Sequence, residues 1–179
     1  MRTATTIAFL SAALSSSAMP VDHTHAIPNT LVVTSDADAG SVKWWTVVIP
    51  DGVGRIRGTA QIDEGYFNDA WRPLVGVAVS EDDSKQMSVH FTLLRSGEVD
   101  VFLKCTASDP VRNQRFPARY GKGAFIEYDI SWKEQVFLVT LGKEARSEIA
   151  CPISTNHLEL SVSSGRGRVE VYDDPEADG

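Results

Sequence analysis

Residues 87–93 of this chain read MSVHFTL, and residues 98–104 read EVDVFLK. In both stretches apolar and polar residues alternate with a period of two, which is typical of a β-strand with one buried face and one face in water. The same alternation recurs at 126–132 (IEYDISW) and at 158–162 (LELSV). Further runs that favour strands lie at 42–49, 55–62, 74–80, 135–141, 146–150 and 167–172.

Turn-forming residues separate these runs, at Pro50–Gly52, Ser96–Gly97, Gly142–Lys143 and Ser164–Gly165. No long window carries the apolar spacing of an amphipathic helix. We therefore expect an all-β fold: a two-sheet antiparallel β-sandwich, similar to a jelly roll, of about ten short strands. Residues 106–122 contain two prolines and several basic side chains, and we expect a long irregular loop there.

The composition is that of a single acidic globular domain. The chain has 179 residues, of which 42% are apolar, and its 17 basic and 24 acidic residues give a net charge of -7. This size is sufficient for one buried core. Phosphate groups would repel an acidic chain, so the charge argues against a nucleic-acid partner and against binding to anionic membranes.

The first 18 residues follow the plan of a secretory signal peptide. Arg2 supplies a positive charge, residues 3–14 carry none, and small residues at 16–18 fit cleavage after Ala18. The apolar run is shorter than the roughly 20 residues that a membrane helix needs, and no run of that length follows. The mature product is then secreted or periplasmic. We expect a signal peptide at 1–18, an extended lead-in at 19–30, a single sandwich domain at 31–172 and a disordered tail at 173–179.

Cys105 and Cys151 are the two cysteines of the chain, and each ends a strand-like run. In an oxidising compartment outside the cytosol, two such cysteines tend to form a disulfide. We therefore expect one disulfide between them. Two buried free thiols are the alternative.

Residues 125–172 contain a recurring order of β elements. A strand that ends at Trp132 leads into a hairpin whose turn is Gly142–Lys143, and the closing strand ends in Val-Glu-Val-Tyr at 169–172. This part of the chain resembles the concanavalin A-like lectin/glucanase superfamily, whose fold is a jelly roll. The resemblance implies two curved antiparallel sheets and a role that involves saccharides.

The hydrolytic members of that superfamily set three carboxylates at alternating positions of one strand. Glu127 and Asp129 match the first two positions, but Ser131 stands at the third, or Trp132 if the strand has a bulge. Retaining glycoside hydrolysis needs two carboxyl groups about 5–5.5 Å apart, one of which protonates the leaving group. Because the residue for protonation is missing, we expect no catalytic residues. Glu127 and Asp129 are the candidates if the protein is an enzyme.

The segment 64–72 (EGYFNDAWR) concentrates aromatic and hydrogen-bonding residues where the alternation stops. Sugar rings stack on aromatic faces, and their hydroxyls bind polar side chains. The alternative is that the rings cover one end of the core. The candidate ligand-binding residues are Tyr66, Phe67, Asn68, Asp69, Trp71 and Arg72.

Other aromatic positions bear on a binding face. Trp44 and Trp45 are adjacent on a predicted strand, so one of them faces the core and the other faces outward. Phe102 stands on the polar side of its strand, and an exposed aromatic residue on a sheet can mark a binding face. In the expected loop at 106–122, the interleaved arginines could hold an acidic glycan or could be solvated.

Asp36 and Asp38, followed by Gly40, match the first half of a calcium loop, but the glutamate that completes an EF-hand is absent. The superfamily resemblance implies a structural calcium between an early segment and the last strand, to which Asp173 could contribute. A plain turn is the alternative. We expect no cofactor, and the candidates for a metal site are Asp36, Asp38 and Asp173.

These patterns favour a secreted, non-catalytic β-sandwich that binds carbohydrate or a cell-envelope surface component. Its partner would be a saccharide or a surface glycan. Two alternatives stay open. One is a glycoside hydrolase or polysaccharide lyase on the same scaffold, and the other is a secreted protein–protein interaction module.

Overall fold

The computed structural model describes residues 30–50, 53–68, 71–82, 84–143 and 145–172. The predicted signal peptide at 1–18 and tail at 173–179 lie outside the described residues, as does the predicted lead-in up to residue 29. The predicted sandwich domain at 31–172 is described almost in full. No helix that could cross a membrane occurs in the described part of the chain.

The described residues form ten strands, and each pairs antiparallel with its neighbours. The alternation of apolar and polar residues lets each strand bury one side and leave the other outward. The strands are β1 (Thr30–Val48), β2 (Arg55–Gly65), β3 (Leu74–Asp82), β4 (Lys85–Leu93), β5 (Glu98–Cys105), β6 (Arg112–Gly121), β7 (Ile126–Lys133), β8 (Val136–Leu141), β9 (Ala145–Ala150) and β10 (His157–Tyr172).

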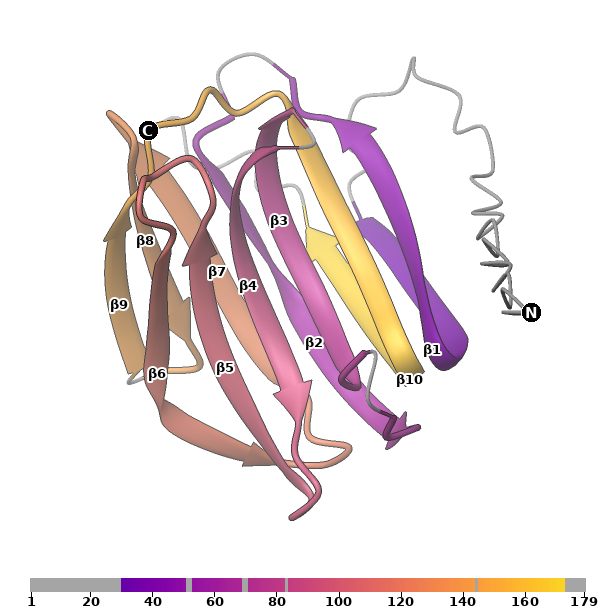
Figure 1. Ribbon diagram of the computed structural model, residues 1–179. Coiled ribbons are helices and arrows are strands. Elements are labelled where there is room, and N and C mark those ends of the chain that lie inside the picture. Colours follow the sequence, from indigo (N-terminus) through magenta and orange to yellow (C-terminus); the bar gives the residue numbers. More distant parts are fainter. Residues whose placement is uncertain (1–29, 51–52, 69–70, 83, 144, 173–179) are drawn as a thin grey trace, which may run out of the picture.

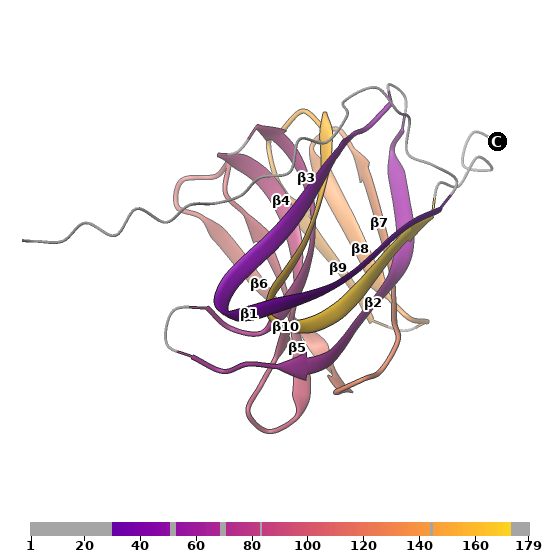
Figure 2. The ribbon, with the colours of Figure 1, turned by 90° about the vertical axis from the view of Figure 1, so that its right-hand side faces the viewer.

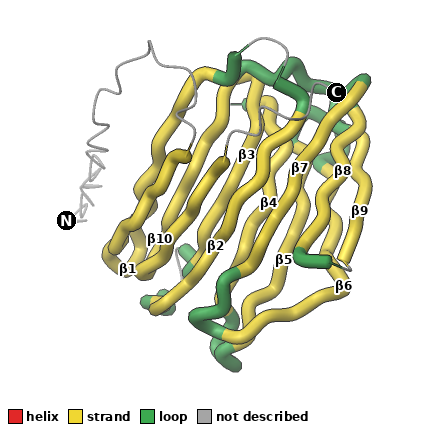
Figure 3. The backbone as a smooth tube through the Cα atoms, turned by 180° about the vertical axis from the view of Figure 1, so that it is seen from behind, coloured by secondary structure: helices red, strands yellow, loops and turns green. Residues whose placement is uncertain are grey.

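Two sheets pack face to face because the long strands β1 and β10 bend and belong to both. The front sheet of Figure 1 has the order β6-β5-β4-β3, followed by residues 157–163 of β10 and 42–48 of β1. The back sheet begins with residues 30–37 of β1 and 165–172 of β10 and continues as β2-β7-β8-β9. Figure 2 shows the bent strands joining the two layers, and Figure 3 shows the back sheet from its outer side. This is the predicted antiparallel jelly roll.

The bend lies at Gly40 in β1 and Ser164 in β10. Both have positive backbone φ angles, 79° for Gly40 and 46° for Ser164, a conformation that glycine adopts readily and serine rarely. Ser164 is fully buried, and its hydroxyl accepts hydrogen bonds from the Gly40 N–H (3.0 Å) and from the Asn68 side-chain amide (3.1 Å). These bonds hold the two strands in the bent conformation.

The core lies between the sheets and consists of the inward-facing apolar side chains of both. On β3 these are Val75, Val77 and Val79, which are fully buried. Phe91 of the front sheet and Tyr128 of the back sheet approach each other with ring centroids 6.0 Å apart. Aromatic contacts of this kind and the burial of apolar area stabilise the sandwich.

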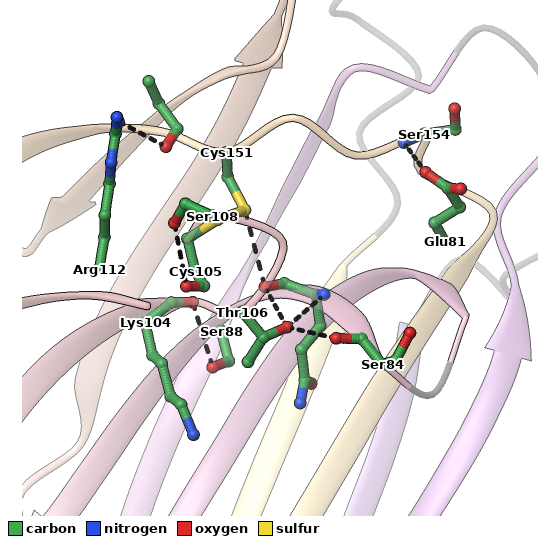
Figure 4. The surroundings of a disulfide bond; sticks show 12 residues. Glu81, Ser84, Ser88, Lys104, Cys105, Thr106, Ser108, Arg112, Cys151 and Ser154 are labelled. Atoms are coloured by element: carbon green, nitrogen blue, oxygen red, sulfur yellow. Dashed lines mark hydrogen bonds between the residues drawn. A yellow bond between two sulfur atoms is a disulfide. The ribbon is translucent and has the colours of Figure 1, made fainter. Parts of the chain in front are cut away.

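The predicted disulfide between Cys105 and Cys151 is confirmed. Figure 4 shows that it joins the end of β5 to the segment after β9, so the bond ties the front sheet to the back sheet. Both cysteines are fully buried. A hydrogen bond of 2.5 Å from Gln114 of β6 to Ser147 of β9 links the same two edges.

Two sequence predictions are wrong. The expected loop at 106–122 contains β6, which pairs with β5 and forms an edge of the front sheet. Its polar residues and Pro117 hide the strand pattern, because an edge strand with a bulge tolerates both. The expected turn at Ser164–Gly165 is not a turn, because the chain stays in β10 and bends there.

Removing the disulfide should lower the stability of the sandwich. Cys105 and Cys151 are 46 residues apart, and in the chain-entropy model the closure of such a loop contributes about 4 kcal/mol. We expect the double variant Cys105→Ala/Cys151→Ala to lose most of this free energy of unfolding, measured by urea denaturation. An unchanged free energy would mean that the core and the Gln114–Ser147 contact already hold the two sheets together.

Candidate functional site

The outer face of the front sheet, called the front face below, is the candidate functional site. Its outward-facing residues form rows, because they occupy equivalent register positions on neighbouring strands. One row combines two large aromatic residues, an imidazole and a guanidinium with two very small residues. Its members, in order from β1 to β6, are Trp44, Ser161, Gly76, His90, Phe102 and Arg115.

The middle of the front face is a low strip of small side chains along β3. Gly76, Ala78 and Ser80 face outward from β3, opposite its core valines, and Ser88 faces outward from β4. Although they face outward, Ala78, Ser80 and Ser88 are only 7%, 1% and 1% exposed. Larger side chains therefore stand around them. Trp44, which lies in the same row as Gly76, is half exposed.

Gly76 lowers this strip between Ser161 and His90. A Cβ atom at position 76 would lie 2.4 Å from the Ser161 hydroxyl and 3.6 Å from the Cδ2 atom of His90. Any side chain there would displace Ser161 and fill the space beside the imidazole. The glycine therefore keeps the space beside this edge of the His90 ring free of a side chain from β3.

His90 is mostly buried. No hydrogen bond to its ring nitrogens occurs among the described residues, and neither nitrogen is sealed from solvent. Burial, together with the positive charge of Lys104, lowers the pKa of His90 from 6.5 to about 4. At neutral pH the ring is therefore uncharged, and it can donate one hydrogen bond and accept another.

The lowered pKa of His90 predicts a loss of stability in acid. Between pH 6.5 and pH 4 the unfolded chain binds a proton at His90 that the folded protein does not, so the free energy of unfolding falls as the pH drops. This difference amounts to about 3 kcal/mol at pH 4. We expect His90→Gln to be less sensitive to acid by that amount, measured by urea denaturation at pH 7 and pH 4. If the variant and the parent protein lose equal stability between pH 7 and pH 4, the pKa of His90 is not lowered in the folded protein.

At one end of the low strip the front face is hollowed. The hollow has a volume of about 640 Å³ and lies over the end of β3, next to β10 and the second half of β1. Inside it, the Ser80 hydroxyl donates a hydrogen bond of 2.6 Å to Glu159. The residues that line the hollow are Thr46, Ser80, Glu81, Asp82, Ser84, His157 and Glu159.

Two acidic residues of the hollow are held in the ionised form. The pKa of Glu81 is lowered, chiefly by its hydrogen bond from Lys85. The pKa of Asp82 is lowered, chiefly by its hydrogen bond from the Ser84 hydroxyl. An ionised carboxylate accepts hydrogen bonds from ligand hydroxyls but has no proton to donate. Glu81 and Asp82 are therefore suited to binding polar groups rather than to acid catalysis.

On the side of β5 and β6, the front face carries a cluster of ionised groups. Asp100 is almost fully buried and accepts hydrogen bonds from Arg115 at 2.6 and 2.7 Å. Arg119 contacts both Asp100 and Glu98. The Arg115 guanidinium also lies 5.9 Å from the centre of the Phe102 ring. These contacts hold Phe102 and Arg115 in place at the β6 end of the row.

The candidate residues of segment 64–72 lie at the bend between the sheets and have different partners. Partial burial and the neighbouring Asp36 carboxylate raise the pKa of Tyr66. Asn68 has a structural role in addition to its bond at the bend. Its amide donates to the Tyr66 carbonyl, and its side-chain carbonyl accepts from the Trp71 N–H at 2.8 Å.

Phe67 and Trp71 stay partly exposed. The guanidinium of Arg95 lies 5.2 Å from the centre of the Phe67 ring, and the Arg72 carbonyl accepts a hydrogen bond from β10. Asp69 lies outside the described residues. A binding role for the residues of this segment stays a prediction.

Glu127 and Asp129, the candidates for catalysis, lie on β7 in the back sheet and alternate with core residues. Asp129 forms a bidentate ion pair with Arg55, with distances of 2.5 to 3.2 Å. The two carboxylates thus belong to the opposite layer of the sandwich from the front face and its hollow.

Asp36 and Asp38, two of the metal candidates, lie in β1 next to the bend. The carboxylate of Asp36 contributes to the raised pKa of Tyr66. Among the described residues there is no group of three or more His, Cys, Asp or Glu side chains that could hold a metal ion, and Asp173 lies outside them. A calcium site stays a prediction.

Proteins of known structure share this fold. The transglycosylase Crh5 aligns with a TM-score of 0.52 and 11% identity, over 84% of this chain and 86% of that one. A polysaccharide lyase of family 18, aly-SJ02, aligns with a TM-score of 0.51 and 7% identity, over 81% and 86%. Chicken galectin 2 aligns with a TM-score of 0.44 and 15% identity, over 75% and 92%. No protein-family profile and no curated protein matches the sequence.

The structural likeness shows that the chain has the concanavalin A-like jelly-roll fold, which the resemblance of residues 125–172 implied. At such low identity the likeness shows the fold alone. The functional class has to be argued from the front face.

Sequence reasoning found single members of the front face but not the row. The sequence marks Phe102 and one of the pair Trp44 and Trp45 as outward-facing, yet it does not reveal which tryptophan this is or that the aromatics align with His90. One local signal was available. Gly76, Ala78 and Ser80 alternate with valines, so the polar side of this strand consists of the smallest residues. An outward strand face that consists of Gly, Ala and Ser leaves space for a ligand above the sheet.

Proposed function

We propose that the protein is an exported, non-catalytic saccharide-binding protein and that the front face is its binding site. The observation that carries this proposal is the row in which the half-exposed Trp44 stands across the low strip from His90 and Phe102. An exposed indole offers an apolar face to a sugar ring. The uncharged His90 offers a hydrogen-bond donor and an acceptor to the sugar hydroxyls.

The dimensions of the front face fit a saccharide chain. Neighbouring strands lie about 4.8 Å apart, so Trp44 on β1 and His90 on β4 are separated by roughly 14 Å of sheet. The floor between them consists of Ser161 and Gly76. The hollow around Glu159 continues the site at one end. An apolar platform combined with a few polar groups is typical of small-ligand sites.

The arrangement of carboxylates favours binding over catalysis. Asp100 and Glu159 of the front face lie three strands apart and four residues apart in register, which separates their Cα atoms by roughly 20 Å, whereas glycoside hydrolases use pairs about 5–9.5 Å apart. In the hollow, Glu81 and Asp82 have lowered pKa values and are poor proton donors. The predicted catalytic pair lies in the other sheet.

The comparisons support a saccharide as the class of partner. The names of two proteins with this fold, a transglycosylase and a polysaccharide lyase, refer to glycosyl groups and polysaccharides. Their likeness to this chain supports the partner class. The geometry of the front face supports the location of the site.

Two variants remove indoles of nearly equal exposure, since Trp44 is 50% and Trp71 is 48% exposed. A glycan array first identifies oligosaccharides that the parent protein binds, and isothermal titration calorimetry then compares the variants. We expect Trp44→Ala to weaken binding by about tenfold or more, because the sugar ring loses its apolar platform. We expect Trp71→Ala to change affinity by less than about twofold.

The opposite pattern, loss of affinity in Trp71→Ala but not in Trp44→Ala, would move the site to segment 64–72. No binding to any glycan on the array, with or without calcium, would contradict saccharide binding as such. Both indoles are half exposed, so neither truncation should unfold the protein. Circular dichroism checks this point.

Export is the second part of the proposal. The signal-peptide pattern at 1–18 supports it, and so does the buried disulfide, because disulfides persist mainly outside the cytosol. We expect the protein recovered from the periplasm or medium of a secreting bacterial host to begin at Met19, as measured by mass spectrometry. A full-length chain retained in the cytosol would contradict export.

A further inference from the structure

Lys104 and His90 stand close together on the front face. Lys104 of β5 is paired in register with Ser88 of β4, and His90 is paired with Phe102, so Lys104 and His90 are diagonal neighbours. Diagonal pairs on adjacent strands lie about 7–8 Å apart, within reach of a long side chain. The positive charge of Lys104 contributes to the lowered pKa of His90, which agrees with this closeness.

Lys104 differs from the arginines of the same side, which are paired with carboxylates. Arg115 is neutralised by Asp100, and Arg119 by Asp100 and Glu98. No ion pair of Lys104 occurs among the described residues. An ammonium group beside a recessed surface, without a carboxylate to bind, is free to bind an anion from a ligand.

The hydrogen-bonding capacity of the two groups matches an anionic acceptor. The ammonium group of Lys104 offers only donors, and the uncharged ring of His90 offers one N–H. A carboxylate or a sulfate ester on a sugar ring accepts several hydrogen bonds and carries the compensating charge. A neutral hydroxyl would satisfy the donors but would leave the charge of Lys104 unpaired.

The side of the low strip opposite Lys104 carries negatively charged groups. Glu159 shares a row with Lys104 but lies three strands away, or roughly 14 Å. It borders the hollow together with the ionised Glu81 and Asp82. These carboxylates repel an anion and accept hydrogen bonds from hydroxyls. The front face thus fixes which end of a ligand carries the negative charge.

We infer that the front face prefers saccharides that carry an anionic group, and that Lys104 and His90 hold this group while Glu159 accepts hydrogen bonds from ring hydroxyls. The inference rests on the proposed saccharide-binding function and names the substrate class of that site. The acidic character of the whole chain does not produce this preference, because its net charge of -7 opposes it at long range.

The test uses matched ligands that differ only in charge. Uronic-acid tetrasaccharides of several linkages are titrated by calorimetry beside their carboxyl-reduced, neutral forms, and the neutral forms are also tested after sulfation. We expect the parent protein to bind an acidic form about tenfold more tightly than its neutral counterpart. We expect Lys104→Met to abolish this difference while leaving the affinity for the neutral form within about twofold.

Lys133→Met is the matched control, since Lys133 is an exposed lysine at the end of β7 in the back sheet. It should leave all affinities unchanged. A measurement on the parent protein does not depend on any variant: affinity for the acidic form should fall with added salt more steeply than affinity for the neutral form. Binding of the sulfated but not the uronate ligands would support the inference and assign sulfate as the anion.

These measurements distinguish a failure of the anion preference from a failure of saccharide binding as such. Equal affinity for acidic and neutral forms, with both weakened by Trp44→Ala, would overturn the preference for anions and leave saccharide binding intact. An equal loss for both forms in Lys104→Met would also overturn it, because Lys104 would then act on the shape of the site rather than on charge. Absence of binding by every form, together with an empty glycan array, would overturn the proposed function and this inference with it.

Discussion

The hydrogen bonds at Ser164 are the constraint on which the rest of the structure depends. The buried hydroxyl of Ser164 accepts from Gly40 on β1 and from Asn68 in the loop after β2. The Ser164 carbonyl accepts a third bond, of 2.6 Å, from the Tyr66 N–H. Three chain segments are thereby fixed at one point. The two longest strands can bend there and pass from the back sheet into the front sheet, and they pair with each other on both sides of the bend, with a register shift between Ala37 and Val42.

This bend determines where the front face begins. Gly40 ends the part of β1 that belongs to the back sheet, and Trp44 lies in the part that pairs with β10 in the front sheet. Pairing is regular from β10 through β3 and β4 to β5 over the residues of the row. This regular register aligns Trp44 with Phe102 on the far side of the sheet. The disulfide and the Gln114–Ser147 contact fix the other edge, so the sandwich is held at both sides.

Local pattern predicted most of the fold. Alternation over 87–93 and 98–104 identified β4 and β5. Cys105, at the end of β5, and Cys151, after β9, were correctly expected to pair. The pattern failed where tertiary contacts override it. In β6, the arginines and Pro117 look like loop residues until β5 is present as a partner. In β10, Ser164 and Gly165 look like a turn until Asn68 and Gly40 hold Ser164 in place.

The candidate site was less accessible to prediction. A binding face on a sheet is made by residues from strands that are distant in sequence, and their alignment depends on register, which no local pattern specifies. Phe102 and one residue of the Trp44–Trp45 pair could be marked as outward-facing. His90, Lys104 and Glu159 have ordinary sequence surroundings. The aromatic and polar composition of segment 64–72 led to its prediction as a binding site. In the structure, Asn68 and Tyr66 in that segment are engaged in holding the bend.

The central claim is that a saccharide lies on the front face, across the low strip between Trp44 and His90. The most direct measurement is the change in backbone amide chemical shifts when the isotope-labelled protein is titrated with an oligosaccharide selected from the glycan array. The account predicts that the largest changes occur at Trp44, Gly76, His90 and Lys104. Changes confined to segment 64–72, or to Glu127 and Asp129 on the back sheet, would contradict it.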